Sequence, residues 1–143
     1  MSDPQSETRT AIVERDFPFP LERLWRALTQ PHLIEEWLMK NDFAPNVGHQ
    51  FKLKGDWGGV LDCEVLAVEP HRTLSYTWDF KHDDPAYNLQ SMVTFTLTPS
   101  ATGTHLRMEQ SGFQPGQKAA YGGAHAGWKA FFEKLDQLLA KGE

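Results

Sequence analysis

The stretch LERLWRALTQPHLIEEWLM, residues 21–39, holds two apolar patterns of helical spacing on either side of a proline. Before Pro31 the apolar residues recur every three or four positions, as on one helical face: Leu21, Leu24, Trp25 and Leu28. After it the same spacing returns in Leu33, Ile34, Trp37 and Leu38. A proline disfavours helical angles at the preceding residue and suits the first position of a helix. The stretch therefore predicts two short helices that meet at an angle.

The surrounding chain has 143 residues, of which 40% are apolar, enough to bury one core without a disulfide or a metal. No linker rich in Gly, Ser or Pro divides it. We therefore expect one domain over residues 8–143, preceded by a disordered N-terminus over residues 1–7. The formal net charge is -5 and Lys and Arg form no run, which argues against nucleic acid as a partner.

Cysteine usage and the absence of long apolar segments bear on cellular location. Cys63 is the only cysteine, which excludes an internal disulfide and fits a reducing compartment. The first ten residues lack the basic start and apolar run of a signal peptide, and no segment approaches the roughly 18 apolar residues of a membrane span. We expect a cytoplasmic protein, either a monomer or a homodimer.

Past residue 48 the apolar period changes from near 3.6 to 2, which is typical of strands with one buried face. The alternation runs through residues 49–70, with a turn at 55–59, and then through 71–80, 89–99 and 103–113. An earlier segment, residues 8–17, is also rich in β-branched residues. Short turns join these segments, so we expect one antiparallel sheet with an apolar face and a wet face.

The last 29 residues, 115–143, predict a long helix whose second half is strongly apolar on one side. That stripe consists of Trp128, Phe131, Phe132, Leu135, Leu138 and Leu139. An order of strand, two helices, five strands and a helix predicts an α+β arrangement in which the long helix packs across the apolar face of the sheet.

The first half of this helix, YGGAHAG at residues 121–127, is almost without side chains. A glycine inside a helix costs about 1 kcal/mol relative to alanine, so three of them call for a compensating gain. Two explanations stay open: the helix backbone approaches the sheet closely there, or the small residues leave room for a ligand.

Five stretches together resemble one known family: PLERLWRALTQPHLIEEW, VGHQFKL, VLAVEPHRTLSYTW, VTFTLTPSATGTHLRMEQSGF and GWKAFFEKLDQLL. They are similar to the C-terminal domain of the heat-shock protein 90 ATPase activator and its homologues, of the START-like (SRPBCC) superfamily. The resemblance implies a helix-grip, Bet v-like fold, in which a curved sheet of six or seven strands wraps around the C-terminal helix. It also implies a cavity between sheet and helix, with Trp25 anchoring its helix to the core and Trp37 near the cavity mouth.

The resemblance leaves function open, because the superfamily includes lipid and hormone binders, cyclases and aromatases. Our first hypothesis is a binding module for a small apolar or aromatic molecule, since aromatic walls with few polar groups suit that task. The expected ligand-binding residues are Trp37, Trp78, Met92, Gln110, Tyr121, His125 and Trp128. The second is a co-chaperone or stress-response protein that binds a chaperone and no ligand.

The third hypothesis is an enzyme of cyclase or aromatase type, in which His125, with Tyr121, handles protons. His125 is a weak catalytic candidate because its helical position suits a solvated or hydrogen-bonded histidine better, so we expect a protein that is not an enzyme. The six histidines form no pair four residues apart, and residues 81–85 lack the glycine and glutamate of a calcium loop. We expect neither a metal nor a cofactor.

Overall fold

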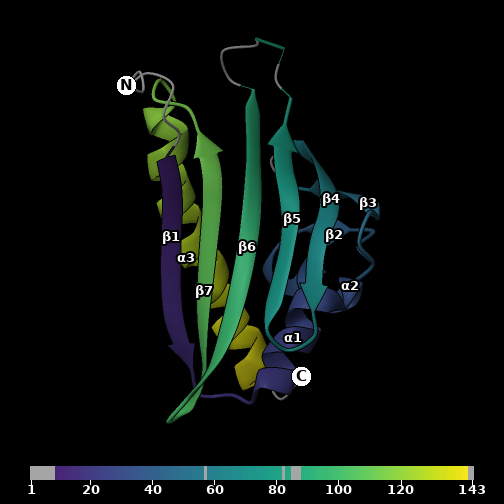
Figure 1. Cartoon of the computed structure of the whole chain (residues 1–143), viewed down its shortest axis with the longest axis vertical. Coiled ribbons are helices and arrows are strands. Elements are labelled where there is room, and N and C mark those ends of the chain that lie inside the picture. Colours follow the sequence, from purple (N-terminus) through teal and green to yellow (C-terminus); the bar gives the residue numbers. More distant parts are fainter. Residues whose placement is uncertain (1–8, 57, 82, 85–87, 142–143) are drawn as a thin grey trace.

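A computed structural model describes residues 9–56, 58–81, 83–84 and 88–141; the N-terminus predicted to be disordered, residues 1–7, lies outside them. Over these described residues, seven strands and three helices follow one another (Figure 1). The strands are β1 (Arg9–Phe17), β2 (Lys40–Asn41), β3 (Gln50–Lys54), β4 (Val60–Glu69), β5 (Thr73–Phe80), β6 (Leu89–Ser100) and β7 (Gly103–Phe113). The helices are α1 (Leu21–Thr29), α2 (Pro31–Trp37) and α3 (Lys118–Ala140). In the part of the chain so described, no helix is long and apolar enough to cross a membrane.

The seven strands form one antiparallel sheet in the order β1-β7-β6-β5-β4-β3-β2. This confirms the prediction of an antiparallel sheet in an α+β fold. The edge strand β2 has only two residues, too few to show an alternating pattern in the sequence. The first strand pairs with the last, with Val13 opposite Met108, so strands from the two ends of the sequence of strands lie side by side at one edge of the sheet. That pairing brings β1 beside the strand that leads into α3.

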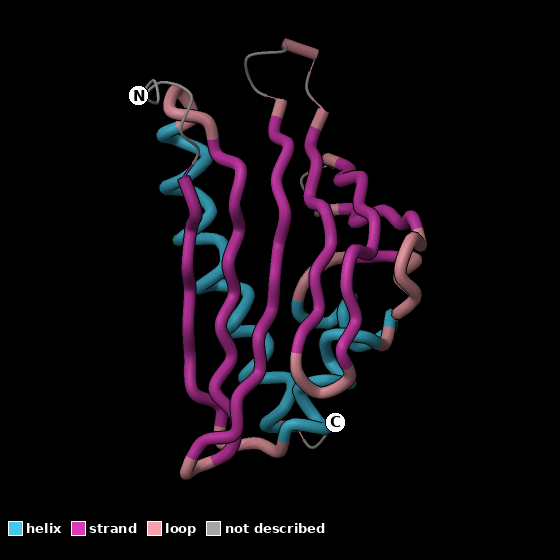
Figure 2. Tube along the Cα trace, in the orientation of Figure 1, coloured by secondary structure: helices cyan, strands magenta, loops and turns pink. Residues whose placement is uncertain are grey.

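Helix α3 lies along one face of the sheet, behind it in the view of Figures 1 and 2. Its apolar stripe packs into the core: the Trp128 ring meets Phe95 of β6 edge-on with centroids 5.6 Å apart, and Phe132 meets Phe17 of β1 at 6.0 Å. The inward strand residues alternate as predicted, and Leu106 and Met108 are completely buried. The core therefore lies between α3 and the sheet.

The two short helices are where the sequence placed them, but Trp37 is buried in the core and not near the mouth of a cavity. Gln30 has extended angles (φ -99°, ψ 121°) and Pro31 starts α2, as the proline rule predicts. Trp37 is 1% exposed, and its indole N–H donates to the carbonyl of Ala27 at 2.8 Å. Trp25 is only half-buried, beside the His71 ring. Trp37 is the better-buried anchor, because its whole ring lies in the core and its N–H has a partner, whereas Trp25 packs against the core while staying partly exposed.

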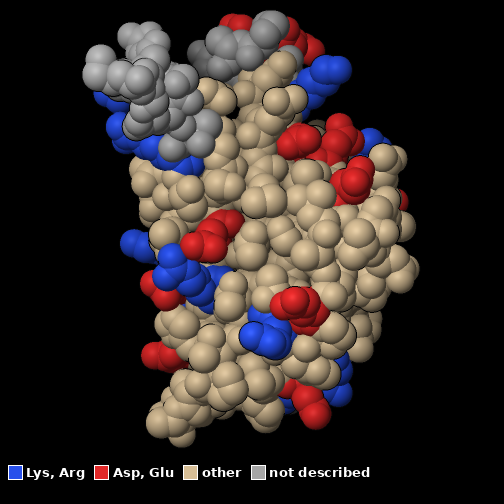
Figure 3. All heavy atoms as spheres, viewed as in Figure 1, with Lys and Arg blue, Asp and Glu red and all other residues tan. Residues whose placement is uncertain are grey.

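The outer face of the sheet is wet and carries charges of both signs, interspersed over the surface seen in Figure 3. An ion-pair cluster ties β1 to β7 here: His105 Nε2 lies 2.9 Å from Glu14 Oε1, and His105 Nδ1 lies 2.8 Å from Asp16 Oδ1. Hydrogen bonding to Glu14, and then to Asp16, raises the pKa of the His105 imidazole.

Candidate functional site

A pocket of about 180 Å³ lies between the first half of α3 and strands β5, β6 and β7. We call it the helix pocket. Four of its ten lining residues are aromatic, and one side is the small-residue face of α3. The lining includes Trp78, Gln110, Phe113, Gly123, Gly127 and Trp128. Because Gly123 is exposed, the pocket opens to solvent past the N-terminal turns of α3.

The glycines of α3 do not serve a close approach between helix and sheet. A Cβ atom placed on Gly122, Gly123 or Gly127 would meet no heavy atom within 4 Å beyond its own helix turn. The close-approach explanation is therefore wrong, and the space beside two of these glycines belongs to the helix pocket. Gly122 is exposed and does not line it, so the three glycines are not equivalent.

A directional chain of buried hydrogen bonds crosses the wall of the pocket. The indole Nε1–H of Trp128 donates to Gln110 Oε1 at 2.9 Å, and Gln110 Nε2 donates to Ser91 Oγ at 3.0 Å. Ser91 then donates to the carbonyl of Trp78 at 2.6 Å. Gln110 is 2% exposed, and this chain gives its amide oxygen one partner and its amide nitrogen one acceptor.

Three of the seven predicted ligand-binding residues line the helix pocket: Trp78, Gln110 and Trp128. The rings of Trp78 and Trp128 lie 5.1 Å apart. Trp37 is elsewhere in the core, and Met92 is 40% exposed on the outer face of the sheet. Met92 alternates with the inward residues Ser91 and Val93, so the pleat of β6 turns it away from α3.

Tyr121 and His125 lie on a different side of α3, facing β1. The Tyr121 hydroxyl donates to the carbonyl of Thr10 at 3.4 Å, and its ring meets Phe113 edge-on. His125 Nδ1 lies 3.1 Å from the carbonyl of Tyr121 one turn earlier, and their rings are 4.7 Å apart. Neither residue lines the helix pocket, so the proposed proton-handling pair is not aimed at it.

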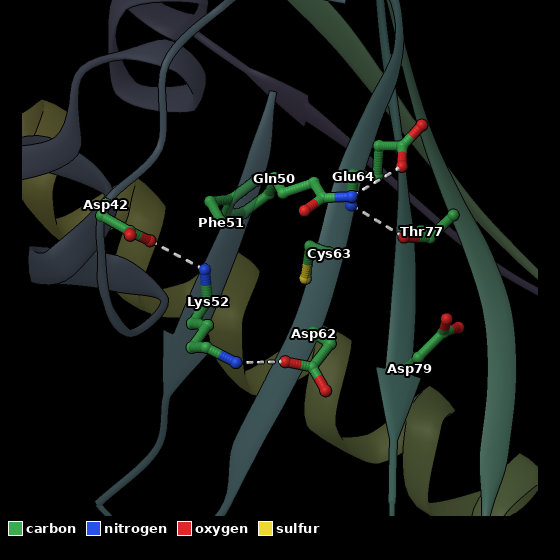
Figure 4. Close-up of a pocket in the computed structure, with 9 residues that line it drawn as sticks. All are labelled: Asp42, Gln50, Phe51, Lys52, Asp62, Cys63, Glu64, Thr77 and Asp79. Atoms are coloured by element: carbon green, nitrogen blue, oxygen red, sulfur yellow. Dashed lines mark hydrogen bonds and ion pairs between the residues drawn. The ribbon is translucent and has the colours of Figure 1, made fainter. Parts of the chain in front are cut away.

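Larger hollows occur on the surface, and one of them is a groove on the outer face of β3, β4 and β5, which we call the outer-sheet groove (Figure 4). It measures about 460 Å³. Its polar groups pair with one another. Lys52 Nζ lies 2.6 Å from Asp62 Oδ1, and the backbone N–H of Lys52 donates to Asp42 Oδ1 at 2.7 Å. The side chains of Lys52 and Asp62 are both more than half exposed, so this groove is a solvated charged surface.

Two titratable groups that line this groove, Asp79 and Cys63, have pKa values that are raised mainly by burial. Burial raises the pKa of Asp79, and the N–H of Ser91, which donates to this carboxyl, opposes that shift. Burial, and next the charge of Asp79, raises the pKa of the Cys63 thiol, which is therefore a poor nucleophile. Among the residues described, no group of three or more His, Cys, Asp or Glu side chains is arranged to hold a metal ion.

Sequence reasoning missed several residues that line the helix pocket or support its wall, although the signals were present. Alternation counted backwards from Val93 places Ser91 and then Leu89 on the inner face. Helical spacing counted backwards from Phe131 through Gly127 and Gly123 marks one stripe of α3. The small residues were noticed, but which of them faced the sheet depends on the rotation of α3.

A family model described as "Activator of Hsp90 ATPase homolog 1-like protein" matches residues 18–140. No curated protein matches the chain. Among solved structures, protein MLL2253 from Mesorhizobium loti shares 70% sequence identity and a TM-score of 0.91, over 94% of this chain and 99% of that one.

More distant solved structures share the fold. BH1534 from Bacillus halodurans is 27% identical, with a TM-score of 0.75 over 91% of this chain and 96% of that one. DynU16, described as a protein in the dynemicin biosynthetic locus, is 27% identical with a TM-score of 0.81. The alignment with DynU16 covers 94% of this chain and 48% of that chain, so this chain spans about half of its length.

Proposed function

The chain belongs to the family of activator of Hsp90 ATPase homolog 1-like proteins, and within it we propose that the protein binds a small aromatic molecule in the helix pocket. The observation that carries the proposal is the open space beside Gly123 and Gly127. These glycines weaken α3 without improving its packing, and a ligand in the space they leave would offset that cost.

The size of the pocket limits the ligand. An apolar cavity of about 150 Å³ accommodates a benzene-sized ring, whereas drug-sized ligands occupy about 300–1,000 Å³. At about 180 Å³, the helix pocket fits one ring with a short substituent. A lipid or a fused multi-ring compound would extend out of the pocket into solvent.

The lining of the pocket fits the same ligand class. Trp78, Phe113 and Trp128 present ring faces and edges, and aromatic pairs with centroids about 4.5–7 Å apart add to the gain from burial. DynU16, at 27% identity, is described as a protein in a biosynthetic locus, and a role in biosynthesis would call for a site that takes a metabolite.

The proposal is tested by titrating toluene into ¹⁵N-labelled protein and following the indole N–H signals of the tryptophans. A ligand of seven heavy atoms at roughly 0.5–0.8 kcal/mol per atom gives a Kd on the order of 0.1–3 mM. The signals of Trp78 and Trp128 should shift saturably in that range. Trp25, which lies on α1 beside His71, should not move.

Two matched variants locate the binding. In Gly127→Leu the new side chain leans toward the N-terminus of α3 and fills the helix pocket, which should abolish the saturable shifts. Gly122→Leu makes the same chemical change on the exposed side of the helix and should leave them intact. Toluene binding that survives Gly127→Leu, or no saturable shift in the unmodified protein, would refute the proposal.

A further inference from the structure

The buried amide of Gln110 has only one possible orientation. An indole N–H can donate a hydrogen bond but cannot accept one, so the atom facing Trp128 Nε1 at 2.9 Å must be the amide oxygen. The nitrogen then faces Ser91 Oγ, at 3.0 Å. This assignment rests on the chemistry of the partners and not on the similar shapes of the two amide atoms.

Ser91 fixes the direction of the chain a second time. Its hydroxyl has one hydrogen, and the 2.6 Å contact with the carbonyl of Trp78 uses it, because a carbonyl can only accept. The Ser91 oxygen must therefore accept from Gln110. Both neighbours of Gln110 require its nitrogen to donate toward β6 and its oxygen to accept from α3.

One N–H of Gln110 is left over after these bonds are made. The amide nitrogen carries two hydrogens, and within the described residues its only partner is Ser91. Gln110 is 2% exposed and lines the helix pocket. A buried donor without a partner is costly, so a ligand that supplies an acceptor at this point is favoured over one that does not.

We propose that Gln110 selects ring compounds that carry a hydrogen-bond acceptor, such as an aryl ketone, by donating its remaining N–H to that acceptor. The inference rests on the proposed binding of a small aromatic molecule in the same pocket. It adds polarity to the ligand: the ring lies among Trp78, Phe113 and Trp128, and the acceptor atom points at β7. Gln110 acts as a specificity-determining residue.

The test compares two probes of the same shape, acetophenone and α-methylstyrene, in which a carbonyl oxygen replaces a terminal CH₂. Water solvates the ketone better, so the raw affinities are not diagnostic. The diagnostic quantity is the ratio of the two Kd values in each protein. In Gln110→Met, which removes the donor at similar volume, the ratio should shift about five- to tenfold against acetophenone relative to the unmodified protein.

Gln90→Met is the matched control, because Gln90 is an exposed side chain on the outer face of β6 beside Ser91. The ratio should not change in it. A second measurement needs no variant: in the unmodified protein, one side-chain amide proton of Gln110 should move downfield with acetophenone and stay in place with α-methylstyrene.

The outcomes separate this inference from the proposed function. If toluene and both probes fail to bind, the proposed function is wrong and the inference is overturned with it. If all three bind, but the ratio is unchanged in Gln110→Met or the amide proton responds equally to both probes, the pocket binds rings and the selection by Gln110 is refuted.

Discussion

Replacing the glycines of α3 by alanine, one at a time and together, should stabilise the protein. Gly122, Gly123 and Gly127 lie within the helix, and a methyl group on any of them meets nothing within 4 Å. Alanine in place of glycine in a helix then gains about 0.4–1 kcal/mol, largely because the unfolded chain has fewer conformations to lose.

The magnitude follows from adding three such gains. The triple variant should be more stable by about 1–3 kcal/mol, and for a chain of this length each kcal/mol raises Tm by about 4 °C. We therefore expect Tm to rise by about 5–12 °C, measured by circular dichroism, with the urea midpoint moving in parallel and the m-value unchanged.

The same substitutions should separate stability from binding. A methyl group at Gly123 or Gly127 enters the helix pocket, and crowding a packed ligand costs about 1–3 kcal/mol, so toluene binding should weaken about fivefold or more. Gly122→Ala should stabilise the protein equally and leave binding unchanged, because it does not line the pocket.

One pattern of stabilities would refute this reasoning. If Gly122→Ala stabilises while Gly123→Ala and Gly127→Ala destabilise, the backbone of α3 lies against the sheet. The glycines would then be explained by packing, and the space beside them would not exist in solution.

Three further predictions concern the rest of the fold. Two carboxylates raise the pKa of His105, so its ion pairs stabilise the fold fully below the ordinary imidazole pKa of about 6.5, and this stabilisation is lost as pH rises through the raised pKa. The urea midpoint of the unmodified protein should therefore fall across that pH interval. An equal fall in His105→Gln would count against this explanation. Cys63 is buried, and burial raises the pKa of its thiol, so this thiol should react with Ellman's reagent at pH 8 only as fast as the protein unfolds. An immediate reaction in the native protein would contradict the placement of Cys63 on the inner face of the sheet. Gly112 has φ +112°, and a Cβ there would lie 2.6 Å from the carbonyl oxygen of Gln90. Gly112→Ala should therefore lower the free energy of unfolding, measured with urea, by about 2–4 kcal/mol. An unchanged free energy of unfolding would show that this part of β7 relaxes freely.

The alternating strands and the paired helices could be predicted from the sequence because their signals are local. Tyr76, Trp78 and Phe80 lie two residues apart, and a pleated strand turns such residues to one face whatever the rest of the chain does. Pro31 likewise separates α1 from α2 through its own ring geometry. The two-residue strand β2 carries no period, so only its pairing with β3 defines it.

The candidate site could be predicted only in part, since lining a pocket depends on two elements at once. Trp78, Gln110 and Trp128 line the pocket, and local periodicity alone turns each of them toward the core. Met92 was misplaced although alternation already put it outside, and His125 was misplaced because the rotation of α3 against the sheet is not written in its own sequence.

The sequence by itself determined which residues form strands and helices, which faces are apolar, and that the first half of α3 is nearly bare. Only the tertiary structure decided what that bareness does. A glycine has no side chain, so it leaves room beside a helix. Whether the sheet packs into that room or leaves a space depends on aromatic side chains from strands distant in the sequence, which keep the helix and the sheet apart. The orientation of the Gln110 amide on β7 is decided in the same way, because its two partners come from other elements: Trp128 from α3 and Ser91 from β6.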